Sequence, residues 1–356
     1  MLNNFSISER KVAIIGAGFV GASIAYALTI RKLAREIVLI DIHEEKTIGE
    51  ALDIQHGIPD MGISSVKAGN YEDCKDCDLI IITAGRNRKP GETRLDLIAG
   101  NSAILKNVVD QMKPHYTKGV IMIVSNPVDV LVYQCTKWMG LPNGMVFGTG
   151  CILDSSRFTR LIADYTRLNT EVVKATIVGE HGDAQIPIWS RVSIAGVPIQ
   201  EYCENVGLRW GENIRKDISD KVREMGATII KGKGRTHYGI ATCVCYLAEA
   251  VLNQRLTIAP VSTMFQGEYG IEDVCLSVPS IIGVNGVEKR LEERWAEEEE
   301  RWEAQDTAQV KGFSESLEES MAFFEKMVQG EVMPVSLNEI VDDWKSAFYM
   351  GRKESA

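Results

Sequence analysis

Two short stretches of the chain carry side chains whose types and spacing suit proton transfer on a small acid. His181 lies in GEHGD, and it is the only one of the five histidines in a glycine-flanked turn directly after a predicted buried strand. A histidine in such a turn can give or accept a proton near neutral pH. Asp154 and Arg157 stand three residues apart in GTGCILDSSRF, so a helix would place both on one face. That face could offer a carboxylate that orients an imidazole and a guanidinium that binds a substrate carboxylate.

Each of these residues also has a purely structural interpretation. His181 could be a hydrogen-bonded imidazole without a catalytic role. Asp154 could cap a helix, and Arg157 could belong to a surface ion pair. The residues alone leave both interpretations open.

Three further polar residues lie in loops that follow predicted strands. Asn126, in VSNPVD, ends a buried strand at the carboxyl edge, where α/β sheets bind ligands. Arg88 and Arg94 lie in RNRKPGETR, a charged stretch without apolar periodicity that predicts a mobile surface loop. Isolated loop arginines are usually solvated, so the pattern by itself assigns them no chemistry.

A βαβ unit at Lys11–Asp41, KVAIIGAGFVGASIAYALTIRKLAREIVLID, must position these groups. Its apolar runs predict buried strands at Val12–Ile15 and Glu36–Ile40, with a helix at Ser23–Leu33 between them. The first strand leads directly into glycines with G-x-G-x-x-G spacing.

Gly16, Gly18 and Gly21 have separate roles in a dinucleotide-binding unit. The first makes the tight turn, the second lets the backbone approach a pyrophosphate, and the third lets the helix pack on the strand. The N-terminus of the helix then offers N–H groups and a positive dipole end to phosphates. Asp41, twenty residues past Gly21, can accept hydrogen bonds from both ribose hydroxyls and would repel a 2′-phosphate. The unit predicts NAD rather than NADP. A glycine-rich turn in some other α/β protein is the alternative.

The pattern of elements predicts the α/β class, with a Rossmann doubly wound parallel sheet followed by an α+β substrate domain. We expect an NAD-binding Rossmann domain at 1–150, a substrate and catalytic domain at 151–328, and a C-terminal helical extension at 329–356. Further strands are predicted at Val66–Ala68, Asp78–Thr83, Val120–Val124, Met145–Phe147, Val172–Val178, Ser193–Ile194, Val197–Pro198, Leu256–Phe265 and Val274–Ile282. Further helices are predicted at Ile98–Met112, Val130–Trp138, Leu153–Tyr165, Ile214–Ile230 and Gly239–Leu252.

Composition narrows the classes of function. The chain has 356 residues, 45% of them hydrophobic, and no apolar run of membrane length. A net charge of −10 argues against a nucleic-acid surface. The N-terminus lacks a secretory pattern and the eight cysteines are scattered, which favours reduced thiols in a cytoplasmic protein. Cys74 and Cys77 form one C-x-x-C without a second pair, so we expect an ordinary loop and no metal site.

From about Lys11 to Lys289 the chain resembles the L-lactate/L-malate dehydrogenase family. The matching segments are GAGFVG, KPGETRLDL, SNPVDVLVYQ, LDSSRF, GEHGD and GRTHYGIA, in this order. The match is closer to the lactate members than to the mitochondrial-type malate members.

The resemblance implies a role for each candidate residue. His181 would be the proton donor and acceptor, Asp154 its orienting carboxylate, and Arg157 the bidentate ligand of the substrate C1 carboxylate. Loop closure would bring Arg94 to the carbonyl that it polarises. Asn126 would bind near that carbonyl, and Thr236 would line the pocket beside the nicotinamide. The NAD-contacting residues would be Gly16, Gly18, Val20, Gly21, Asp41, Lys46, Thr83, Ala84, Gly85, Val124, Asn126 and Ile240.

The resemblance covers two substrate classes, and one loop residue distinguishes them. Lactate-specific members carry Gln where this chain has Arg88, whereas malate-specific relatives carry Arg. A guanidinium there can pair with the second carboxylate of oxaloacetate, while pyruvate would leave it without a partner. Arg88 therefore favours oxaloacetate and L-malate. L-lactate dehydrogenase or a dual-substrate enzyme is the alternative, supported by the lactate-like Thr236.

Two further expectations concern regulation and assembly. Many bacterial lactate dehydrogenases bind fructose 1,6-bisphosphate through an Arg and a His, and the matching positions here are Thr159 and Lys174. We expect a homo-oligomer, a dimer or a homotetramer, in which amphipathic helices of the tail beyond Lys289 pack on the body or on a sister subunit. A non-enzymatic NAD-binding protein and an NAD- and metal-dependent glycosidase are the rival classes.

Overall fold

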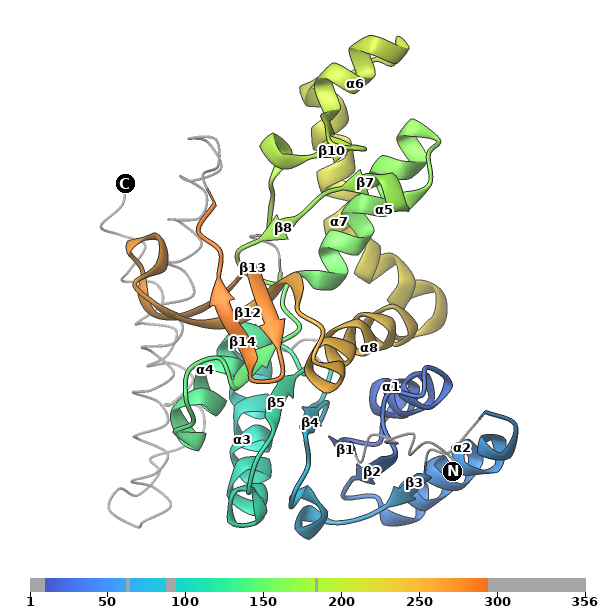
Figure 1. Ribbon diagram of the computed structural model, residues 1–356, viewed down its shortest axis with the longest axis vertical. Helices are drawn as coiled ribbons and strands as arrows, with labels where there is room; N and C mark the ends of the chain where they lie inside the picture. Colours follow the sequence, from blue (N-terminus) through green and yellow to red (C-terminus); the bar gives the residue numbers. More distant parts are fainter. Residues whose placement is uncertain (1–9, 62–64, 88–93, 183–184, 294–356) are drawn as a thin grey trace, which may run out of the picture. The chain divides into compact units, whose positions relative to one another are not determined.

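The main sheet begins with the parallel strands that the βαβ pattern predicts. The computed structural model describes residues 10–61, 65–87, 94–182 and 185–293, all of which belong to one compact unit, residues 1–311. The parallel part of the sheet runs β3-β2-β1-β4-β5-β6 (Figure 1). Its strands are β1 (Lys11–Ile15), β2 (Glu36–Ile40), β3 (Ser65–Ala68), β4 (Leu79–Ile82), β5 (Val120–Ile123) and β6 (Val146–Gly148). This order is that of a doubly wound Rossmann sheet, so the predicted fold class is confirmed.

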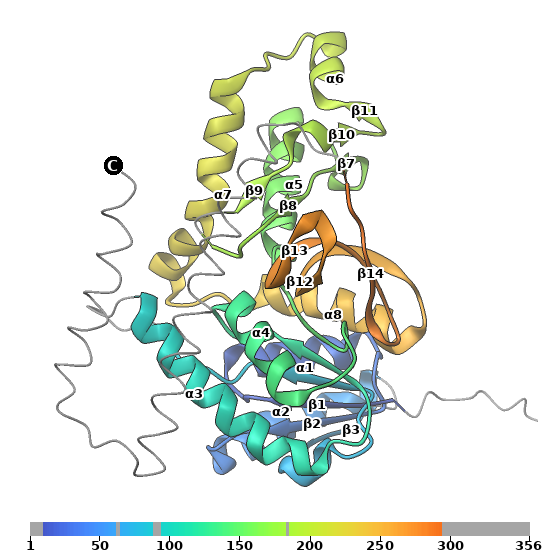
Figure 2. The same ribbon diagram turned by 90° about the vertical axis from the view of Figure 1, so that its left-hand side faces the viewer.

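Helices cover both faces of this sheet (Figures 1 and 2). On one face α1 (Phe19–Ile30), α2 (Glu44–Met61) and α8 (Tyr238–Asn253) pack on one set of strand side chains. On the other face α3 (Arg94–Met112) and α4 (Val128–Met139) pack on the alternate set. β4 and β5 are apolar at every position, and β1 and β2 are apolar after their first residue, because both faces of these central strands are buried.

The sheet continues beyond β6 with strands from the second half of the chain. β12 (Thr257–Gln266), β13 (Glu272–Gly283) and β14 (Gly286–Arg290) are antiparallel, and Ser262 of β12 pairs with Gly148 of β6. The result is a nine-stranded mixed sheet that crosses the predicted domain boundary at residue 150.

The remaining elements form a small α+β layer around α5 (Ile152–Thr166). The prediction of one strand at Val172–Val178 is wrong. The segment forms two short strands, of which the first pairs with β10 and the second with β9. The other elements are β7 (Val173–Lys174), β8 (Ile177–Val178), β9 (Ile186–Pro187), β10 (Ser193–Ile194), β11 (Val197–Pro198), α6 (Ile199–Val206), α7 (Glu212–Lys233) and the short 3-10 helices at Tyr71–Cys74, Lys113–His115, Thr170–Val172, Trp189–Arg191 and Glu268–Gly270.

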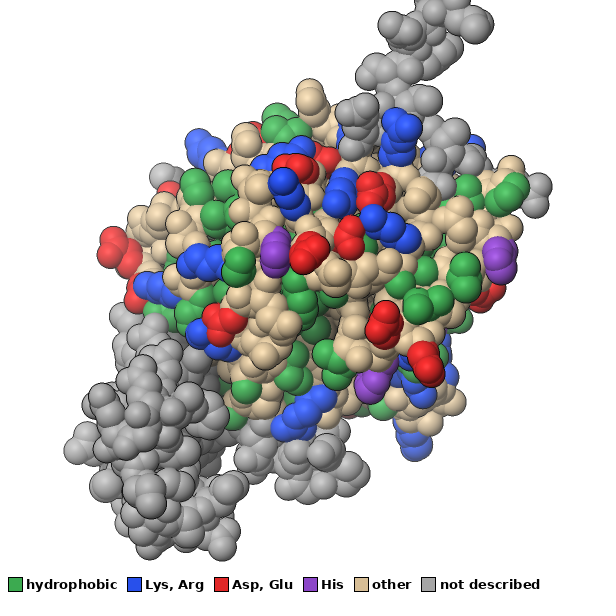
Figure 3. Space-filling view, turned by 90° about the horizontal axis from the view of Figure 1, so that it is seen from below, with side chains coloured by type: hydrophobic (Ala, Val, Ile, Leu, Met, Phe, Trp, Pro, Cys, Tyr) green, Lys and Arg blue, Asp and Glu red, His purple; other side chains and the backbone are tan. Residues whose placement is uncertain are grey.

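Several predictions lie outside the described residues, namely the extension at 329–356 and the amphipathic helices of the tail. The division at residues 150 and 328 stays a prediction. Among the helices of the described residues, none has the length and apolar character that crossing a membrane requires. On the face drawn in Figure 3, Lys and Arg side chains lie interspersed with Asp and Glu side chains.

Candidate active site

The glycine turn after β1 leaves room for a ligand where the dinucleotide motif requires it. Gly16 has a φ of +109°, and a Cβ there would lie 2.6 Å from the Thr83 hydroxyl oxygen. A Cβ on Gly21 would lie 1.8 Å from the Gly16 carbonyl oxygen, so only glycine lets α1 approach the strand this closely. A Cβ on Gly18 would meet nothing within 4 Å. The backbone at Gly18, the N-cap of α1, is therefore open to a pyrophosphate.

The carboxylate of Asp41 is held at the end of β2. Its Oδ2 accepts a hydrogen bond from the Ala17 amide at 2.7 Å, and its Oδ1 accepts one from the His43 amide at 3.0 Å. These two amides fix the carboxylate beside the glycine turn. Each carboxylate oxygen has two lone pairs, so both oxygens can also accept bonds from ribose hydroxyls.

The remaining expected cofactor residues follow the carboxyl ends of neighbouring strands or flank α1. Thr83 donates to the Gly16 carbonyl oxygen at 2.8 Å, and the Ala84 amide donates to the Ile15 carbonyl oxygen at 2.9 Å. The Lys46 ammonium lies 5.6 Å from the centre of the Phe19 ring, at the start of α1. Of the others, Val20 and Ile240 pack against the core beneath α1 and α8, Gly85 is exposed, and Val124 directly follows β5 in a buried position.

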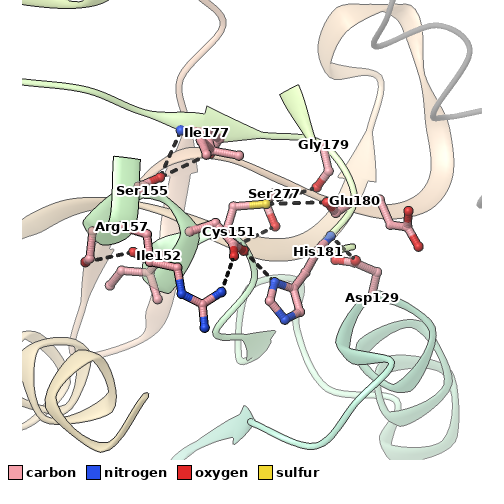
Figure 4. Close-up of polar contacts among 12 residues, drawn as sticks. Asp129, Cys151, Ile152, Ser155, Arg157, Ile177, Gly179, Glu180, His181 and Ser277 are labelled. Atoms are coloured by element: carbon pink, nitrogen blue, oxygen red, sulfur yellow. Dashed lines mark hydrogen bonds and ion pairs between the residues drawn. The ribbon is translucent and has the colours of Figure 1, made fainter. Parts of the chain in front are cut away.

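The candidate catalytic side chains meet at the start of α5 (Figure 4). Asp154 is in the first turn of this helix, and its Oδ2 lies 2.6 Å from His181 Nδ1. Its Oδ1 accepts a hydrogen bond from Arg157 Nη1 at 3.0 Å. The Asp154 side chain is only 3% exposed, against 14% for Arg157 and 24% for His181. This arrangement is a buried ion pair with a histidine attached to it, and not the surface pair that the spacing alone allows.

The charges in this cluster shift the pKa values of both partners. Burial lowers the pKa of His181, but the carboxylates of Asp154 and Asp129 together outweigh it, and the net pKa lies above the ordinary value. Burial raises the pKa of Asp154, but His181 and Arg157 outweigh it, and the net pKa is lowered. The geometry therefore favours a carboxylate beside an imidazolium. An imidazolium whose Nδ1 side faces Asp154 can donate the proton on Nε2 to a substrate.

The other predicted site residues come from elements other than α5 and the His181 turn. Asn126 follows β5, and its carbonyl oxygen accepts a bond from Asn101 Nδ2 at 2.6 Å. Asn101 Oδ1 also accepts a bond from the Arg86 amide at 2.9 Å, so Asn101 ties together the loops after β4 and β5. Thr236 is half-buried between α7 and α8. Arg88 lies outside the described residues, as does the side chain of Arg94, the first residue of α3.

Sequence reasoning missed two groups that hold the His181 turn in place. Asp129 Oδ2 accepts a hydrogen bond from the His181 amide at 2.9 Å. The Cys151 thiol contacts the carbonyl oxygens of Gly179 and Glu180, each at 3.6 Å. The signal for Asp129 was available, since a lone carboxylate in the apolar stretch VDVLVYQC needs a partner when that stretch is buried.

The C-x-x-C thiols are buried, which disfavours their thiolate form. Cys74 and Cys77 are both buried, and burial raises the pKa of each thiol to about 12. Both thiols are therefore protonated at neutral pH. Within the described part of the chain, no group of three or more His, Cys, Asp and Glu side chains could hold a metal ion.

Comparison with known proteins identifies the family of the chain. A family model described as "lactate/malate dehydrogenase, NAD binding domain" matches residues 10–148, and that half is an NAD-binding domain. A second model, "lactate/malate dehydrogenase, alpha/beta C-terminal domain", matches residues 151–323. The chain belongs to the lactate/malate dehydrogenase family, whose members are oxidoreductases that use NAD.

Individual relatives cover most of the chain. The L-lactate dehydrogenase of Thermoanaerobacterium saccharolyticum is 44% identical over 289 residues, 81% of this chain and 93% of the relative. That of Priestia megaterium is 41% identical over 292 residues, 82% of this chain and 92% of the relative. Among solved structures, the minor L-lactate dehydrogenase of Enterococcus mundtii in its ligands-bound form has a TM-score of 0.84 at 40% identity, covering 87% of this chain and 98% of the other.

Proposed function

We propose that this chain is an NAD-dependent L-2-hydroxy acid dehydrogenase that interconverts pyruvate and L-lactate. The observation that carries the reaction type is the buried His181–Asp154–Arg157 cluster beside a dinucleotide-binding edge. The preference for lactate is supported by relatives of 40–44% identity, all named L-lactate dehydrogenase.

Each member of the cluster has one task in this reaction. Bound NADH supplies the hydride that the substrate keto carbon accepts. His181 Nε2 donates a proton to the carbonyl oxygen, because Nδ1 on the other side of the ring faces Asp154. Asp154 keeps the ring oriented and favours its charged form before the transfer.

Arg157 is suited to the substrate carboxylate. A guanidinium carries five N–H donors in one plane, and here a donor on Nη1 is directed to Asp154. This anchor fixes the plane of the guanidinium before substrate arrives, so less conformational entropy is lost on binding. A Cβ at Gly226 of α7 would lie 3.8 Å from Arg157 Nη2, so the glycine leaves space beside that nitrogen.

Oxaloacetate and L-malate are the second candidate pair, and Arg88 is the observation that favours them. The sequence alone made them the first choice, with lactate as the alternative. The named relatives support that alternative better. If the loop RNRKPGETR closes and buries Arg88 against pyruvate, the unpaired charge of the guanidinium costs about 3–5 kcal/mol. A loop that leaves Arg88 in solvent removes this penalty.

The test is kcat/KM for pyruvate and for oxaloacetate, in the wild type and in Arg88→Gln. Lys89→Gln is a matched control, since it removes a neighbouring loop cation without removing Arg88. We expect the wild type to prefer pyruvate, and Arg88→Gln to widen that preference. If the wild type prefers oxaloacetate and only Arg88→Gln loses that preference, the substrate pair is oxaloacetate and L-malate instead.

We also propose a cytoplasmic homo-oligomer, a dimer or a tetramer, that binds a small 2-keto acid and has no nucleic-acid or membrane partner. Large apolar side chains are exposed on α1 and on the two helices that pack against it, namely Tyr26 and Ile30 of α1, Leu52 of α2, and Tyr238 and Tyr246 of α8. Such a surface is typical of an interface between subunits. Light scattering after size exclusion gives the subunit number. A monomer at all concentrations contradicts this proposal.

A further inference from the structure

A second carboxylate, outside the His181–Asp154–Arg157 cluster, contacts the residue that moves the proton. Asp129 is the second residue of α4 and only 3% exposed. Its Oδ2 accepts the hydrogen bond of the His181 main-chain amide at 2.9 Å (Figure 4). The contact joins two separate parts of the chain. Asp129 lies in the first turn of α4, which follows the turn that carries Asn126, whereas His181 comes from the turn after β8.

A buried carboxylate at this position calls for an explanation, because a neutral acceptor could receive the same amide proton. Asparagine has nearly the same shape and a carbonyl oxygen that accepts N–H bonds. Burying a carboxylate is much less favourable than burying an amide, unless other charges compensate. The first turn of α4 compensates in part through its dipole. Positive charge nearby compensates further, and an imidazolium at His181 is one source of it.

We infer that Asp129 is a positioning residue for proton transfer: it anchors the His181 turn to the cofactor-binding half of the molecule and supplies a second negative charge that favours the imidazolium. This inference rests on the proposed role of His181 as proton donor. Asp154 acts on the ring through Nδ1, and Asp129 acts on the backbone that carries the ring.

The other charged groups around His181 leave this role to Asp129. From α5, Asp154 favours the imidazolium and Arg157 opposes it. Glu180 precedes His181, but its side chain is directed away from the imidazole (Figure 4) and lies against Gly182. From α7, Arg223 lies beyond the far end of the turn, where it donates to the Gln185 carbonyl oxygen. Asp129 on α4 is thus the one carboxylate besides Asp154 that, among the described residues, raises the pKa of His181.

Two substitutions separate the anchor from the charge. Asp129→Asn keeps an acceptor for the His181 amide and removes the charge. Asp129→Ala removes both. Asp273→Asn is the matched control, since Asp273 also contacts α4, through Tyr133 and Lys137, but has a half-exposed side chain.

The first readout does not depend on turnover. Neutral imidazole reacts with diethyl pyrocarbonate and imidazolium does not, so the pH dependence of labelling on the His181 peptide of the full chain reports its pKa. We expect the midpoint in Asp129→Asn and Asp129→Ala to fall by at least about half a pH unit, and that of Asp273→Asn to stay unchanged.

The second readout is the pH profile of kcat and KM for keto-acid reduction. Asp129→Asn should keep kcat within about threefold of the wild type at low pH, and its rate should decline at a lower pH than in the wild type. Asp129→Ala should lose about five- to hundredfold in kcat at every pH, because the His181 amide loses its acceptor, with KM for NADH unchanged.

The outcomes are distinguishable. An Asp129→Asn enzyme with the wild-type labelling midpoint overturns the inference, as does an Asp129→Ala enzyme with full kcat. If Asp129→Ala does not fold, the labelling midpoint of Asp129→Asn still tests the inference, because that variant keeps an acceptor for the His181 amide. If His181→Asn keeps its activity, the proposed function itself fails. If His181→Asn is inactive and the Asp129 variants behave as wild type, only the present inference fails.

Discussion

The substitution Asp154→Asn tests most directly whether the buried cluster works as an acid–base device. Asp154 is 3% exposed and contacts His181 Nδ1 at 2.6 Å and Arg157 Nη1 at 3.0 Å. Asparagine fills the same space, so the change removes charge with little change in volume. A hydrogen bond to a charged partner contributes about 1.5–3 kcal/mol. At 1.36 kcal/mol per unit, its loss lowers the pKa of His181 by about 1–2 units.

This shift has a definite sign in the assay. Keto-acid reduction needs protonated His181, so kcat/KM falls as the pH rises through the pKa of the free enzyme. In the wild type that pKa is raised, and the fall is expected above the ordinary histidine value of about 6.5. In Asp154→Asn the fall moves to lower pH. At neutral pH the loss of protonation costs about 10- to 100-fold, and the loss of the Arg157 anchor brings the total to about 10²–10³.

Stability should follow pH with opposite signs for the two partners. The raised pKa of His181 contributes stability below its unfolded value, and that stability is lost as the pH rises through the folded pKa. The lowered pKa of Asp154 contributes stability above its unfolded value, and that stability is lost as the pH falls through the folded pKa. Asp154→Asn should flatten both limbs of a plot of unfolding free energy against pH.

The assay follows nicotinamide absorbance with pyruvate and NADH across about pH 5 to 9, the range over which histidines titrate. Asp164→Asn is the matched control, since Asp164 pairs with Arg160 at 2.8 Å on the same helix but is 52% exposed. Exposed pairs of this kind contribute less than about 1 kcal/mol. The reasoning is refuted if Asp154→Asn stays within about threefold of wild type with an unshifted profile.

Three further predictions follow from the site. His181→Asn should lower kcat by about 10²–10⁴ while NADH still binds, and a normal kcat or lost binding by fluorescence titration would contradict the assigned role. Asp41 should make kcat/KM higher with NADH than with NADPH, because a 2′-phosphate would meet a held carboxylate, and Asp41→Ala should narrow the difference. Fructose 1,6-bisphosphate should not activate at low pyruvate, because Thr159 donates to the Ala175 carbonyl oxygen and Lys174 alone is a single cation. A clear rate increase on titrating the sugar phosphate would show this last expectation to be wrong.

The parts of the fold that were predicted correctly are those fixed by local pattern. Strands β1, β2, β4 and β5 are short, mostly β-branched apolar runs buried on both faces, and such runs between helices are typical of a parallel sheet. The helix after the glycine turn was placed correctly, but it begins at Phe19 and not at Ser23. Its first turn contains Gly21 of the G-x-G-x-x-G motif, and a glycine in a helix interior weakens the sequence pattern that predicts a helix.

Other elements depend on distant partners and could not be predicted in this way. Val172–Val178 reads as one strand, yet it divides because Val173 pairs with Ile194 whereas Val178 pairs with Ile186. Helix α2 was missed because its sequence is rich in charge and contains Pro59. For the same reason the site was predicted in part. The i,i+3 pair on α5 is local, while the contact from Asp129 crosses 52 residues of sequence.

The continuation of the sheet across residue 150 limits how this enzyme can be recombined with its relatives. Gly148 of β6 faces Ser262 of β12, and the Val287 amide donates to the Gly144 carbonyl oxygen at 2.9 Å. A chimaera that exchanges residues 1–150 alone would therefore graft a foreign strand edge onto β12. An exchange that carries β12–β14 together with the first 150 residues keeps every pairing of the sheet native. The segments that must be exchanged together to transfer the NAD-binding half are thus separate in sequence, although hydrogen bonds join them into one sheet.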